Sequence, residues 1–370
     1  MLASRTLLVL LLVFYFILPA LVSEIIFHNE FYIYSRLQGE ANILSLFYGV
    51  IFIFWVHLLF RKEVSSHNCR VSIRLVNWMG LRVAYFAMLV YALLVFIYGQ
   101  KLRVVGASRA ELLDGMDDFL FPGMGLLLML ASVFCVAKAS RLQFYSIFLA
   151  FLLVDMTYNG KIFSFLALVL FFLRLDYAHP SRSTIIKAFG FWGVLGVLML
   201  FFSGLMRMTL AGDDFNSDVV GVAYLFGSEF LGVQASIGWA MEYFSQGYSN
   251  IFWAFGSTLQ DFYNSSVGHG LATSPAAFFE ANFGSLGPFA AIFGCCIALI
   301  SFRVGERVLG WVAYLIVAIN FQHFLRHGID VFLGKVIFQM TFAIVIAALA
   351  TGRFKRSVSG PHRQISLGAE

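Results

Sequence analysis

The residues best suited to chemistry lie between positions 264 and 288, where a polar, glycine-rich segment runs into an apolar one. His269 stands between two glycines, and hydroxyl side chains directly before Pro275 have the order of a helix start. The helix that begins there carries Glu280 and Asn282 into the apolar run. A carboxylate in a membrane helix is costly and is usually kept for function. An ordinary loop before a membrane helix would also explain this segment.

Three side chains are candidates for a general base, the group that removes a proton from an attacking hydroxyl. Glu280 is the first, because partial burial brings the proton affinity of a carboxyl group toward the range that works near neutral pH. Asp330 is the second, although its i,i+4 spacing from Arg326 would also suit a simple ion pair. His269 is the third, and a histidine between glycines is equally compatible with an ordinary loop.

Four cationic side chains lie at the predicted outer ends of membrane helices or in an outer loop: Lys161, Arg207, Arg326 and Arg109. If they converge on one cavity, they would bind a doubly charged group such as a lipid pyrophosphate, because the arginine fork matches phosphate oxygens. The alternative is structural, since each cation could instead reach the membrane surface or pair with an acid on the same side.

Two histidines, His323 and His327, have the i,i+4 spacing of zinc ligands on a helix. Arg326 lies between them and its charge opposes a bound cation, so we expect no metal and no other cofactor. The sequence also has no phosphate-binding P-loop, no dinucleotide-binding glycine pattern, no Asp-x-Asp pair and no Gly-x-Ser-x-Gly. Nucleotide-driven chemistry is therefore not expected, and no nucleic-acid partner is predicted.

These residues belong to a chain whose composition is that of a membrane protein. Hydrophobic residues make up 60% of its 370 positions, charged residues only 12%, and 43 residues are phenylalanine. Repeated apolar runs of about 15–25 residues without alternating polarity indicate spanning helices, not barrel strands. We therefore predict an all-α polytopic membrane protein.

We predict ten transmembrane helices, with both termini on the cytoplasmic side. The spans are residues 6–23, 42–60, 77–98, 119–137, 142–158, 161–175, 187–205, 276–301, 308–323 and 331–350. A single integral membrane domain then covers residues 1–352, with outer loops near 24–41, 99–118, 206–275 and 324–330. Residues 353–370 are expected to form a basic, disordered cytoplasmic tail.

The orientation follows from the distribution of lysine and arginine. With the first residue inside, the cytoplasmic segments hold 17 cations and 4 acids, whereas the outer segments hold 8 cations and 16 acids. Residues 219–244 are apolar enough to span, but a span there would reverse this asymmetry, so we interpret them as a helix on the outer face. The span at 161–175 is short, about 22 Å against a bilayer core of roughly 30 Å. We expect the outer end of the hairpin that it forms with the span 142–158, with Asp155, Asn159 and Lys161, to form the floor of an outward cavity.

Four segments give the chain a resemblance to a known family. They are SRAELLDG at 108–115, YNGKIFSFLALVLFFL at 158–173, GHGLATSPAAFFEANFGSLGPF at 268–289 and FLRHGIDVFLGK at 324–335. Their order and character are similar to those of the Wzy-type polymerases of O-antigen, or oligosaccharide repeat units, in bacterial inner membranes.

The resemblance implies a metal-independent glycosyltransferase of the C-type membrane fold. Its donor and acceptor would be oligosaccharides linked to undecaprenyl pyrophosphate and held in the lipid bilayer, and a chain-length regulator protein would be a further partner. The active face would be periplasmic. Pyrophosphate would be held by Arg207, Arg326, Lys161 and Arg109. The base would be Glu280, Asp330 or His269, and further substrate contacts would come from Glu111, Asn282 and His327.

Three other activities stay open at this point, one of them a membrane acyltransferase, which would need a buried catalytic histidine in a helix, a role for which His323 is the candidate. An O-antigen ligase would have a similar fold and would move the finished glycan to the lipid A core, a reaction for which His269 is suited. A flippase or another transporter is the alternative from a different class, but the sequence has neither repeated halves nor paired broken helices.

Overall fold

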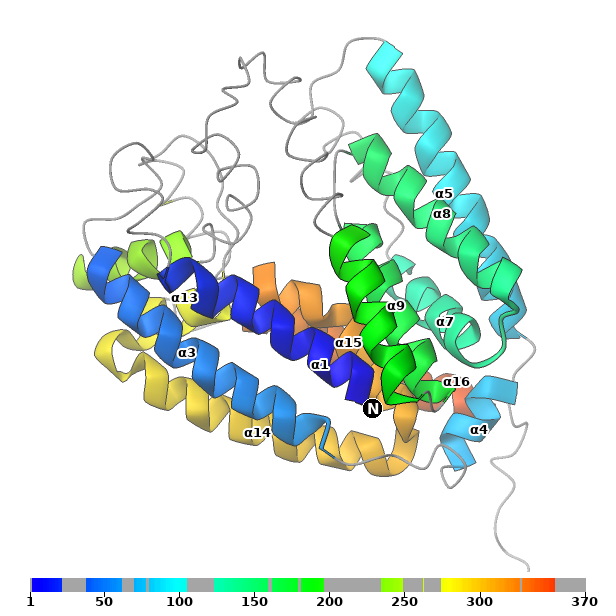
Figure 1. Ribbon diagram of the computed structural model, residues 1–370. Coiled ribbons are helices and arrows are strands. Elements are labelled where there is room, and N and C mark those ends of the chain that lie inside the picture. Colours follow the sequence, from blue (N-terminus) through cyan, green and yellow to red (C-terminus); the bar gives the residue numbers. More distant parts are fainter. Residues whose placement is uncertain are drawn as a thin grey trace, which may run out of the picture.

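The structure is a computed structural model of the chain, and it describes residues 2–21, 38–61, 70–77, 80–104, 123–158, 162–178, 181–195, 234–248, 262, 274–326 and 328–349. Those residues are almost entirely helical and contain no β-strand (Figure 1). Each of the ten predicted spans overlaps a described helix.

The bounds of the helices are as follows. The first half of the chain forms α1 (Leu2–Leu12), which continues into the π-helical η1 (Val13–Ile17), then α3 (Gln38–Leu59), α4 (Arg70–Asn77), α5 (Gly80–Val104), α7 (Met124–Ala137), α8 (Arg141–Tyr158) and α9 (Ile162–Tyr177). The second half forms α13 (Pro275–Phe283), the 3₁₀ turn η2 (Gly284–Leu286), α14 (Gly287–Leu309), α15 (Trp311–Arg326) and α16 (Ile329–Leu349). Residues 182–195 and 234–245 are also helical.

Five helical segments among the described residues are long and apolar enough to cross a membrane, judged by length and composition. They are Leu2–Leu21, Gly39–Leu59, Gly80–Leu102, Pro275–Leu309 and Ile329–Leu349, and Met124–Ala137 is a shorter apolar helix. Large apolar side chains on these helices face outward, such as Phe54 at 62% and Phe289 at 72% exposed. Such a surface is suited to lipid and not to water. The chain thus has the make-up of an all-α membrane protein.

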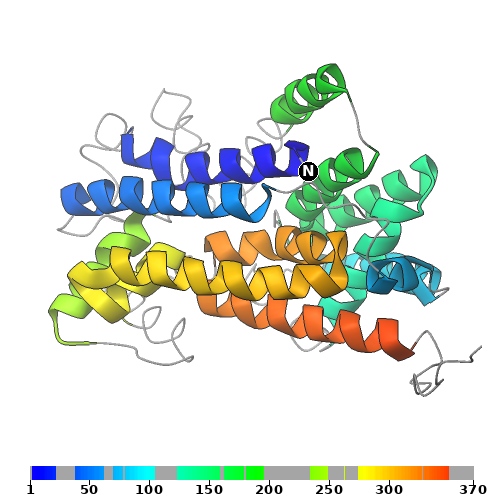
Figure 2. The ribbon, with the colours of Figure 1, turned by 90° about the horizontal axis from the view of Figure 1, so that it is seen from below.

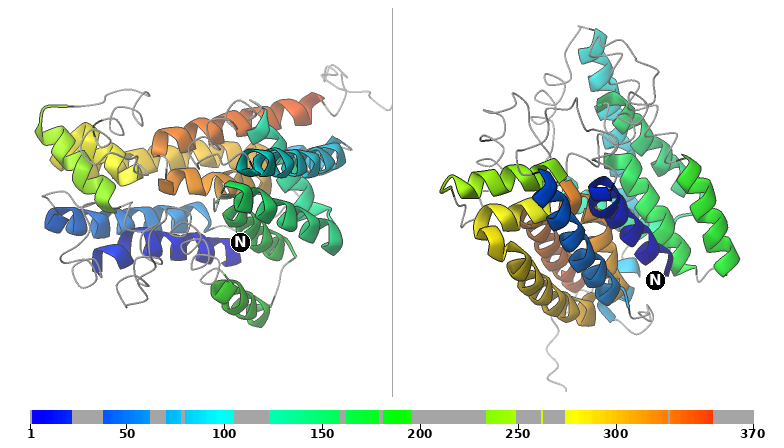
Figure 3. Two further views of the ribbon diagram at one scale, coloured as in Figure 1. Left: turned by 90° about the horizontal axis from the view of Figure 1, so that it is seen from above. Right: turned by 60° about the vertical axis from the view of Figure 1, so that its left-hand side comes forward.

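The helices form two groups that share one apolar core. In the first group, α1, α3 and α14 run side by side, with α15 and α16 packed against α14 (Figures 1 and 2). In the second group, α5 packs on α7 and α8, and α9 joins both groups through contacts with α1 and α15. The helix at 182–195 lies outside α9 (Figure 3), with the Trp192 ring 4.9 Å from Phe171.

Polar contacts fix which helix ends lie together. The buried carboxylate of Asp176, at the end of α9, accepts hydrogen bonds from the backbone N–H groups of Ala3 and Ser4 at 2.9 and 2.8 Å. These N–H groups lie in the first turn of α1, where they have no partner within the helix, so Asp176 caps the start of α1. Arg174 donates to two carbonyl oxygens at the end of α7, at 2.7 and 2.6 Å. The start of α1 and the ends of α7 and α9 therefore share one end of the molecule.

We call this the basic end, because most of the described lysines and arginines lie there. They are Arg5, Arg61, Arg74, Arg82, Lys138, Arg141, Arg174, Arg182, Lys187, Arg303 and Arg307, with Asp176 and Glu306 as the described acids. Away from the basic end, the described helices hold Lys101, Arg326 and Lys335 together with Glu40, Asp155, Glu242, Glu280 and Asp330. Cationic side chains are therefore concentrated at one end of the described helices, as the distribution of lysine and arginine in the sequence predicts.

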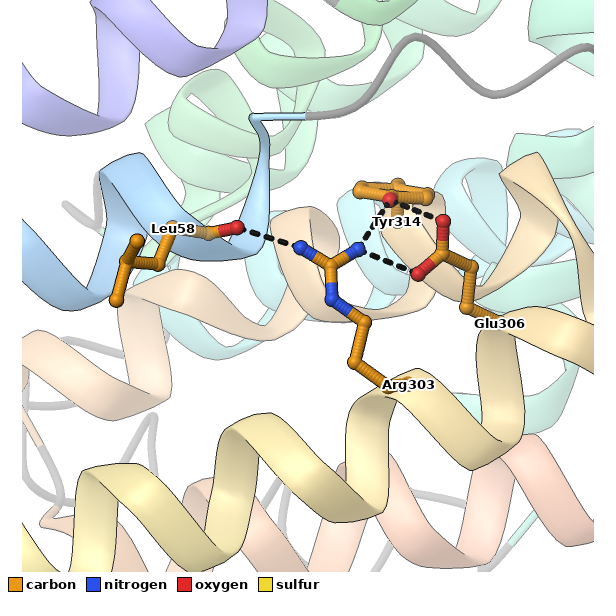
Figure 4. Close-up of polar contacts among 4 residues, drawn as sticks. All are labelled: Leu58, Arg303, Glu306 and Tyr314. Carbon is orange, nitrogen blue, oxygen red and sulfur yellow. Dashed lines mark hydrogen bonds and ion pairs between the residues drawn. The ribbon is translucent and has the colours of Figure 1, made fainter.

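A hydrogen-bonded network joins α3, α14 and α15 at the basic end (Figure 4). Arg303 contacts the carboxylate of Glu306 at 2.5 Å and the hydroxyl of Tyr314 at 3.1 Å, and it donates to the carbonyl oxygen of Leu58 at 2.6 Å. Tyr314 in turn donates to Glu306 at 2.6 Å. The Leu58 carbonyl lies in the last turn of α3, where its backbone hydrogen bond is a long one, from the Arg61 N–H at 3.5 Å. Arg303 therefore fastens the end of α3 to the end of α14.

Replacing Arg303 with alanine should lower the stability of the protein by about 1–3 kcal/mol, because Leu58 and Glu306 lose a charged donor. The change is measured as thermal unfolding of the full chain in detergent. Arg307→Ala is the matched control, since Arg307 is exposed and lies one turn further along the same helix. Equal stability of the two variants would mean that the network contributes nothing.

The structure divides the predicted span 276–301 into two helices. Gly284 has φ +51°, which places it in the left-handed region that glycine adopts readily, and the chain turns there before α14 begins at Gly287. The helix α14 also runs eight residues past the predicted end, to Leu309. Its charged last turns stay helical because Arg303 and Glu306 satisfy each other. The described part of the predicted outer-face helix, residues 234–245, is helical and packs on α13.

Asp155 of α8 holds the start of α9. Its two carboxylate oxygens accept hydrogen bonds from the backbone N–H groups of Phe163 and Ser164, at 3.1 and 2.6 Å. Asp155 therefore caps the start of α9, which limits its use as a ligand-binding group. The helix α9 has 16 residues, about 24 Å, so the prediction of a short helix here is confirmed.

Candidate functional site

The helix that carries Glu280 begins as the sequence predicts. The Ser274 hydroxyl accepts a hydrogen bond from the Ala277 N–H at 3.1 Å, and Pro275 occupies the first turn of α13. Ser236 donates its hydroxyl to Ser274 at 2.9 Å and so fixes the cap from a neighbouring helix. Such a cap is worth about 1 kcal/mol. Because the start of α13 is fixed, the direction in which Glu280 projects is fixed as well.

Glu280 points into the protein and meets Tyr48 of α3. The Tyr48 hydroxyl donates to Oε1 of Glu280 at 2.6 Å, and the two side chains are only 0% and 2% exposed, respectively. The Tyr48 ring stacks on Phe279 with centroids 6.4 Å apart, so the carboxyl group has apolar surroundings. Within the described residues, no lysine or arginine forms an ion pair with Glu280. A carboxyl group buried against a single neutral donor is costly, which favours a role in chemistry.

The break between α13 and α14 brings backbone against this carboxyl group. A Cβ atom at Gly287 would lie 2.5 Å from the Tyr48 hydroxyl and 2.7 Å from Oε1 of Glu280. Only a residue without a side chain fits at that position. We call Glu280, Tyr48 and Gly287 the carboxyl site.

Asn282 lies two residues after Glu280 and therefore points to another side of α13. Its amide nitrogen donates to the Phe278 carbonyl oxygen at 2.7 Å, whereas its Oδ1 is buried and accepts no hydrogen bond from the described residues. An acceptor in this state costs about 1–3 kcal/mol. It suits a donor such as a sugar hydroxyl, although contact between Asn282 and substrate stays a prediction.

A second polar group lies where α15 turns into α16. Arg326 ends α15, Gly328 makes the turn with φ +92°, and Asp330 lies in the first turn of α16. A Cβ at Gly328 would lie 2.6 Å from Oδ1 of Asp330, so the carboxylate folds back over the turn. In the described part of the chain Asp330 forms no ion pair, and the pairing with Arg326 that the spacing suggests is not made.

Lys335 belongs to the same group, and the sequence reasoning gave it no role. Its ammonium nitrogen lies 2.8 Å from Nε2 of His323, so the end of α15 is tied to the second turn of α16. We call His323, Arg326, Asp330 and Lys335 the turn group. Among the described residues, no cluster of three or more His, Cys, Asp or Glu side chains has the geometry to hold a metal ion.

The turn group is set back from the end of α3. The Phe324 ring lies 5.0 Å from Phe52 and 5.4 Å from Trp55, and Phe332 lies 6.2 Å from Trp55. These α3 residues come 14 and 17 positions after Gln38, or about 21–25 Å along the helix. Figure 2 shows the same offset, with the end of α15 and the start of α16 lying well inside the start of α3 and the start of α14. The turn group therefore lies deep along the length of the bundle.

Aromatic rings connect the turn group to the carboxyl site. The Tyr48 ring stacks on Phe52 at 5.8 Å, and Phe52 contacts Phe324, which neighbours His323 in α15. The two polar groups thus lie on either side of one aromatic column. Glu280, Asp330, Arg326 and Asn282 are in the described part of the chain. The predicted residues Arg207, Lys161, Arg109, His269, Glu111 and His327 lie outside the described residues, so the convergence of four cations stays a prediction.

Two functional candidates were missed from the sequence for different reasons. Lys335 gave a usable signal, because it is a charged residue inside the apolar run 331–349. Tyr48 gave none, since it is one of 15 tyrosines and its partner is 232 residues away. Comparison of the chain with known protein families, with curated proteins and with solved structures finds no match.

Proposed function

We propose that the protein is a membrane glycosyltransferase that polymerises oligosaccharide repeat units on a lipid carrier. It would move a growing glycan from undecaprenyl pyrophosphate to the free end of a new repeat unit, which is itself linked to undecaprenyl pyrophosphate. The observation that carries this proposal is the carboxyl site, a buried Glu280 held by Tyr48 at the less basic end of the molecule. The sequence resemblance to Wzy-type polymerases supplies the reaction and the substrate.

The proposal includes ten spans, both termini in the cytoplasm of a bacterium and an active face on the periplasmic side of the inner membrane. The charge distribution supports this orientation, because cations gather at the basic end and lysine- and arginine-rich ends face the cytoplasm in membrane proteins. The carboxyl site and the turn group would then both lie on the periplasmic side of the basic end.

In the proposed reaction, a hydroxyl at the end of the acceptor sugar attacks the anomeric carbon of the donor. Its oxygen forms the new glycosidic bond, the bond between that carbon and the pyrophosphate oxygen breaks, and Glu280 takes the hydroxyl proton. Tyr48 acts as a positioning residue for Glu280. The negative charge that builds on the leaving pyrophosphate is stabilised by Arg326 with Arg207, Lys161 and Arg109.

The direct test is an assay of purified protein with short repeat units on undecaprenyl pyrophosphate. A ladder of longer glycans in the absence of lipid A core supports polymerisation. Product that forms only when lipid A core is added indicates a ligase. Transfer of the intact lipid between the two leaflets of a vesicle, without new bonds, indicates a flippase.

The predicted pyrophosphate cations give a second test. Replacing Arg207 or Arg326 with alanine should lower glycan extension by about 10²–10³-fold, since one well-placed donor to a developing anion is worth about 3–4 kcal/mol. The readout is the length distribution of the glycan, with protein amount measured by immunoblot. Arg61→Ala at the basic end is the control, because Arg61 is exposed and far from the proposed face. Normal chain lengths in both variants would refute the pyrophosphate role.

A further inference from the structure

The first apolar helix is not a regular α-helix along its whole length. After α1, the five residues of η1 form a π-helix, in which the N–H of Leu18 donates to the carbonyl oxygen of Val13, five residues earlier. Turns of this kind are rare in proteins, and where a single one interrupts an α-helix it is frequently at a functional site. The neighbours of η1 are therefore of functional interest.

One side of α3 faces this turn. The Ser45 hydroxyl donates to the carbonyl oxygen of Phe16 at 2.8 Å, and both residues are fully buried. Serine hydroxyls within helices often bond back to the carbonyl oxygen four residues earlier, whereas that of Ser45 crosses to another helix. One turn further along α3, Gly49 allows a close approach. A Cβ atom there would lie 2.6 Å from Cδ1 of Ile17 and 3.0 Å from Cβ of Phe16.

The same side of α3 carries Tyr48. Residues 45, 48, 49 and 52 have the i, i+3, i+4, i+7 spacing of one helix face. The Phe16 ring meets the Phe52 ring edge-on with centroids 5.4 Å apart, and Phe52 stacks on Tyr48 at 5.8 Å. Tyr48 in turn donates to Glu280 at 2.6 Å. The π-helical turn therefore contacts α3 on either side of the residue that holds the candidate base.

These contacts fix more than the distance between two helices. A small residue such as Gly49 is enough to let membrane helices approach each other. A hydrogen bond to one particular carbonyl oxygen also fixes the rotation and the height of α3, because a shift of one residue turns a helix by about 100° and moves it by about 1.5 Å. Tyr48 reaches Glu280 only at one rotation of α3, so the Ser45 bond and the Tyr48 bond depend on the same placement.

We propose that η1 and Ser45 are positioning elements for Tyr48 and, through Tyr48, for the carboxyl group of Glu280. The bond from Ser45 to η1 and the close contact at Gly49 hold α3 so that the Tyr48 hydroxyl stays at hydrogen-bond distance from Glu280. This role rests on the proposed function, in which Glu280 removes a proton. Because η1 and Ser45 act through Tyr48, their disruption should lower kcat for glycan extension and leave KM for the acceptor unchanged.

The first test replaces Ser45 in the purified full chain. Ser45→Ala should lower kcat about three- to tenfold, the effect of one neutral hydrogen bond, with KM within twofold of the original. In the Glu280→Gln background the same change should have no further effect, since both act on one group. Ser132→Ala is the matched control and should keep the original kcat. Ser132 is equally buried, and its hydroxyl has no hydrogen-bond partner among the described residues.

The second test uses the close contact at Gly49. Gly49→Ala should lower kcat about tenfold, because a methyl group 2.6 Å from Cδ1 of Ile17 forces one of the two helices to move. Ile17→Val removes that Cδ1 atom. It should have little effect alone and should raise kcat of Gly49→Ala at least threefold when the two are combined. Thermal unfolding of each variant in detergent checks that it folds.

A third measurement does not depend on glycan synthesis. An apolar carbodiimide reacts with carboxyl groups in apolar surroundings, and the rate of labelling at Glu280 is followed by mass spectrometry. Tyr48→Phe changes this rate by removing the hydrogen bond to the carboxyl group. Ser45→Ala should change the rate in the same direction and at least threefold, whereas Ser132→Ala should leave it unchanged.

The outcomes separate this inference from the proposed function. If the original protein builds a glycan ladder and Ser45→Ala and Gly49→Ala keep its kcat, the positioning role is overturned and the polymerase stands. If Ser45→Ala slows Glu280→Gln as much as it slows the original protein, Ser45 acts on the fold alone and the inference is also overturned. If the original protein builds no glycan but Ser45→Ala alters labelling of Glu280 as Tyr48→Phe does, the positioning role stands and the proposed function fails.

Discussion

Replacing Glu280 with glutamine is expected to lower the rate of glycan extension by about 10²–10⁴-fold, the usual contribution of a positioned general base. Glutamine has nearly the same shape and still accepts the hydrogen bond from Tyr48, so the fold should survive while proton removal is lost. The rate is measured with purified protein and a lipid-linked acceptor. Glu40→Gln is the control, because Glu40 is an exposed carboxylate in the first turn of α3.

Tyr48→Phe gives an intermediate result in the same assay. It removes a hydrogen bond that is worth about 1.5–3 kcal/mol when the partner is charged, so a loss of about 10–10²-fold is expected. The carboxyl group itself remains. The order of rates should therefore be original protein, Tyr48→Phe, then Glu280→Gln. A Glu280→Gln variant as active as Glu40→Gln would make Glu280 a structural residue and leave Asp330 or His269 as the candidate base.

The second large effect is expected from Gly287→Ala, a change of one methyl group. That methyl would lie 2.5 Å from the Tyr48 hydroxyl and 2.7 Å from Oε1 of Glu280, distances at which one of the groups has to move. Tyr48 is rigid and fully buried, so the displacement falls on Glu280 or on the start of α14. Overpacking of this kind costs about 1–3 kcal/mol. A shift of about 1 Å at a reacting group can cost about 10²-fold in rate.

Two comparisons make the Gly287 result specific. Gly334→Ala adds the same methyl group to the interior of α16, where nothing lies within 4 Å, and should leave the rate unchanged and raise stability by about 0.5–1 kcal/mol. The double variant Gly287→Ala with Glu280→Gln should be no slower than Glu280→Gln alone, because both changes act on one group. A Gly287→Ala variant with the original rate would show that the carboxyl site tolerates displacement.

The sequence was sufficient for the features that depend on neighbouring residues. Ten apolar runs each overlap a helix, and the Ser274–Pro275 start of α13 is formed as predicted, because capping and apolar length are local properties. The contrast between the basic end and the opposite end follows from residue positions along the chain. Glu280 and Asp330 were also found from the sequence, since acids in apolar helices are conspicuous.

The features that escaped prediction depend on contacts between distant segments. The partner of Glu280 is Tyr48, which no local pattern distinguishes from other tyrosines. Asp155 was expected to line a cavity, but its oxygens accept from the start of α9, a pairing that depends on how the α8–α9 turn closes. The break at Gly284 within an apolar run was missed because a glycine in such a run is compatible with continuous helix. The spacing of residues along one helix does not reveal which side chains of another helix contact them.

The short, set-back helices have an electrical consequence. Nearly every residue of α15 is buried, and α15 and α9 each have 16 residues, about 24 Å, whereas the outer helices α3 and α5 have 22 and 25. Lipids around the rim therefore meet helices of full length, while α15 and α9 are shorter than these by six to nine residues. A transmembrane voltage acts with about 2.3 kcal/mol per elementary charge per 100 mV across the whole layer. An anionic headgroup bound at the end of α15 would lie part of the way through the transmembrane voltage. The affinity of the protein for that headgroup would therefore depend on the size of the voltage.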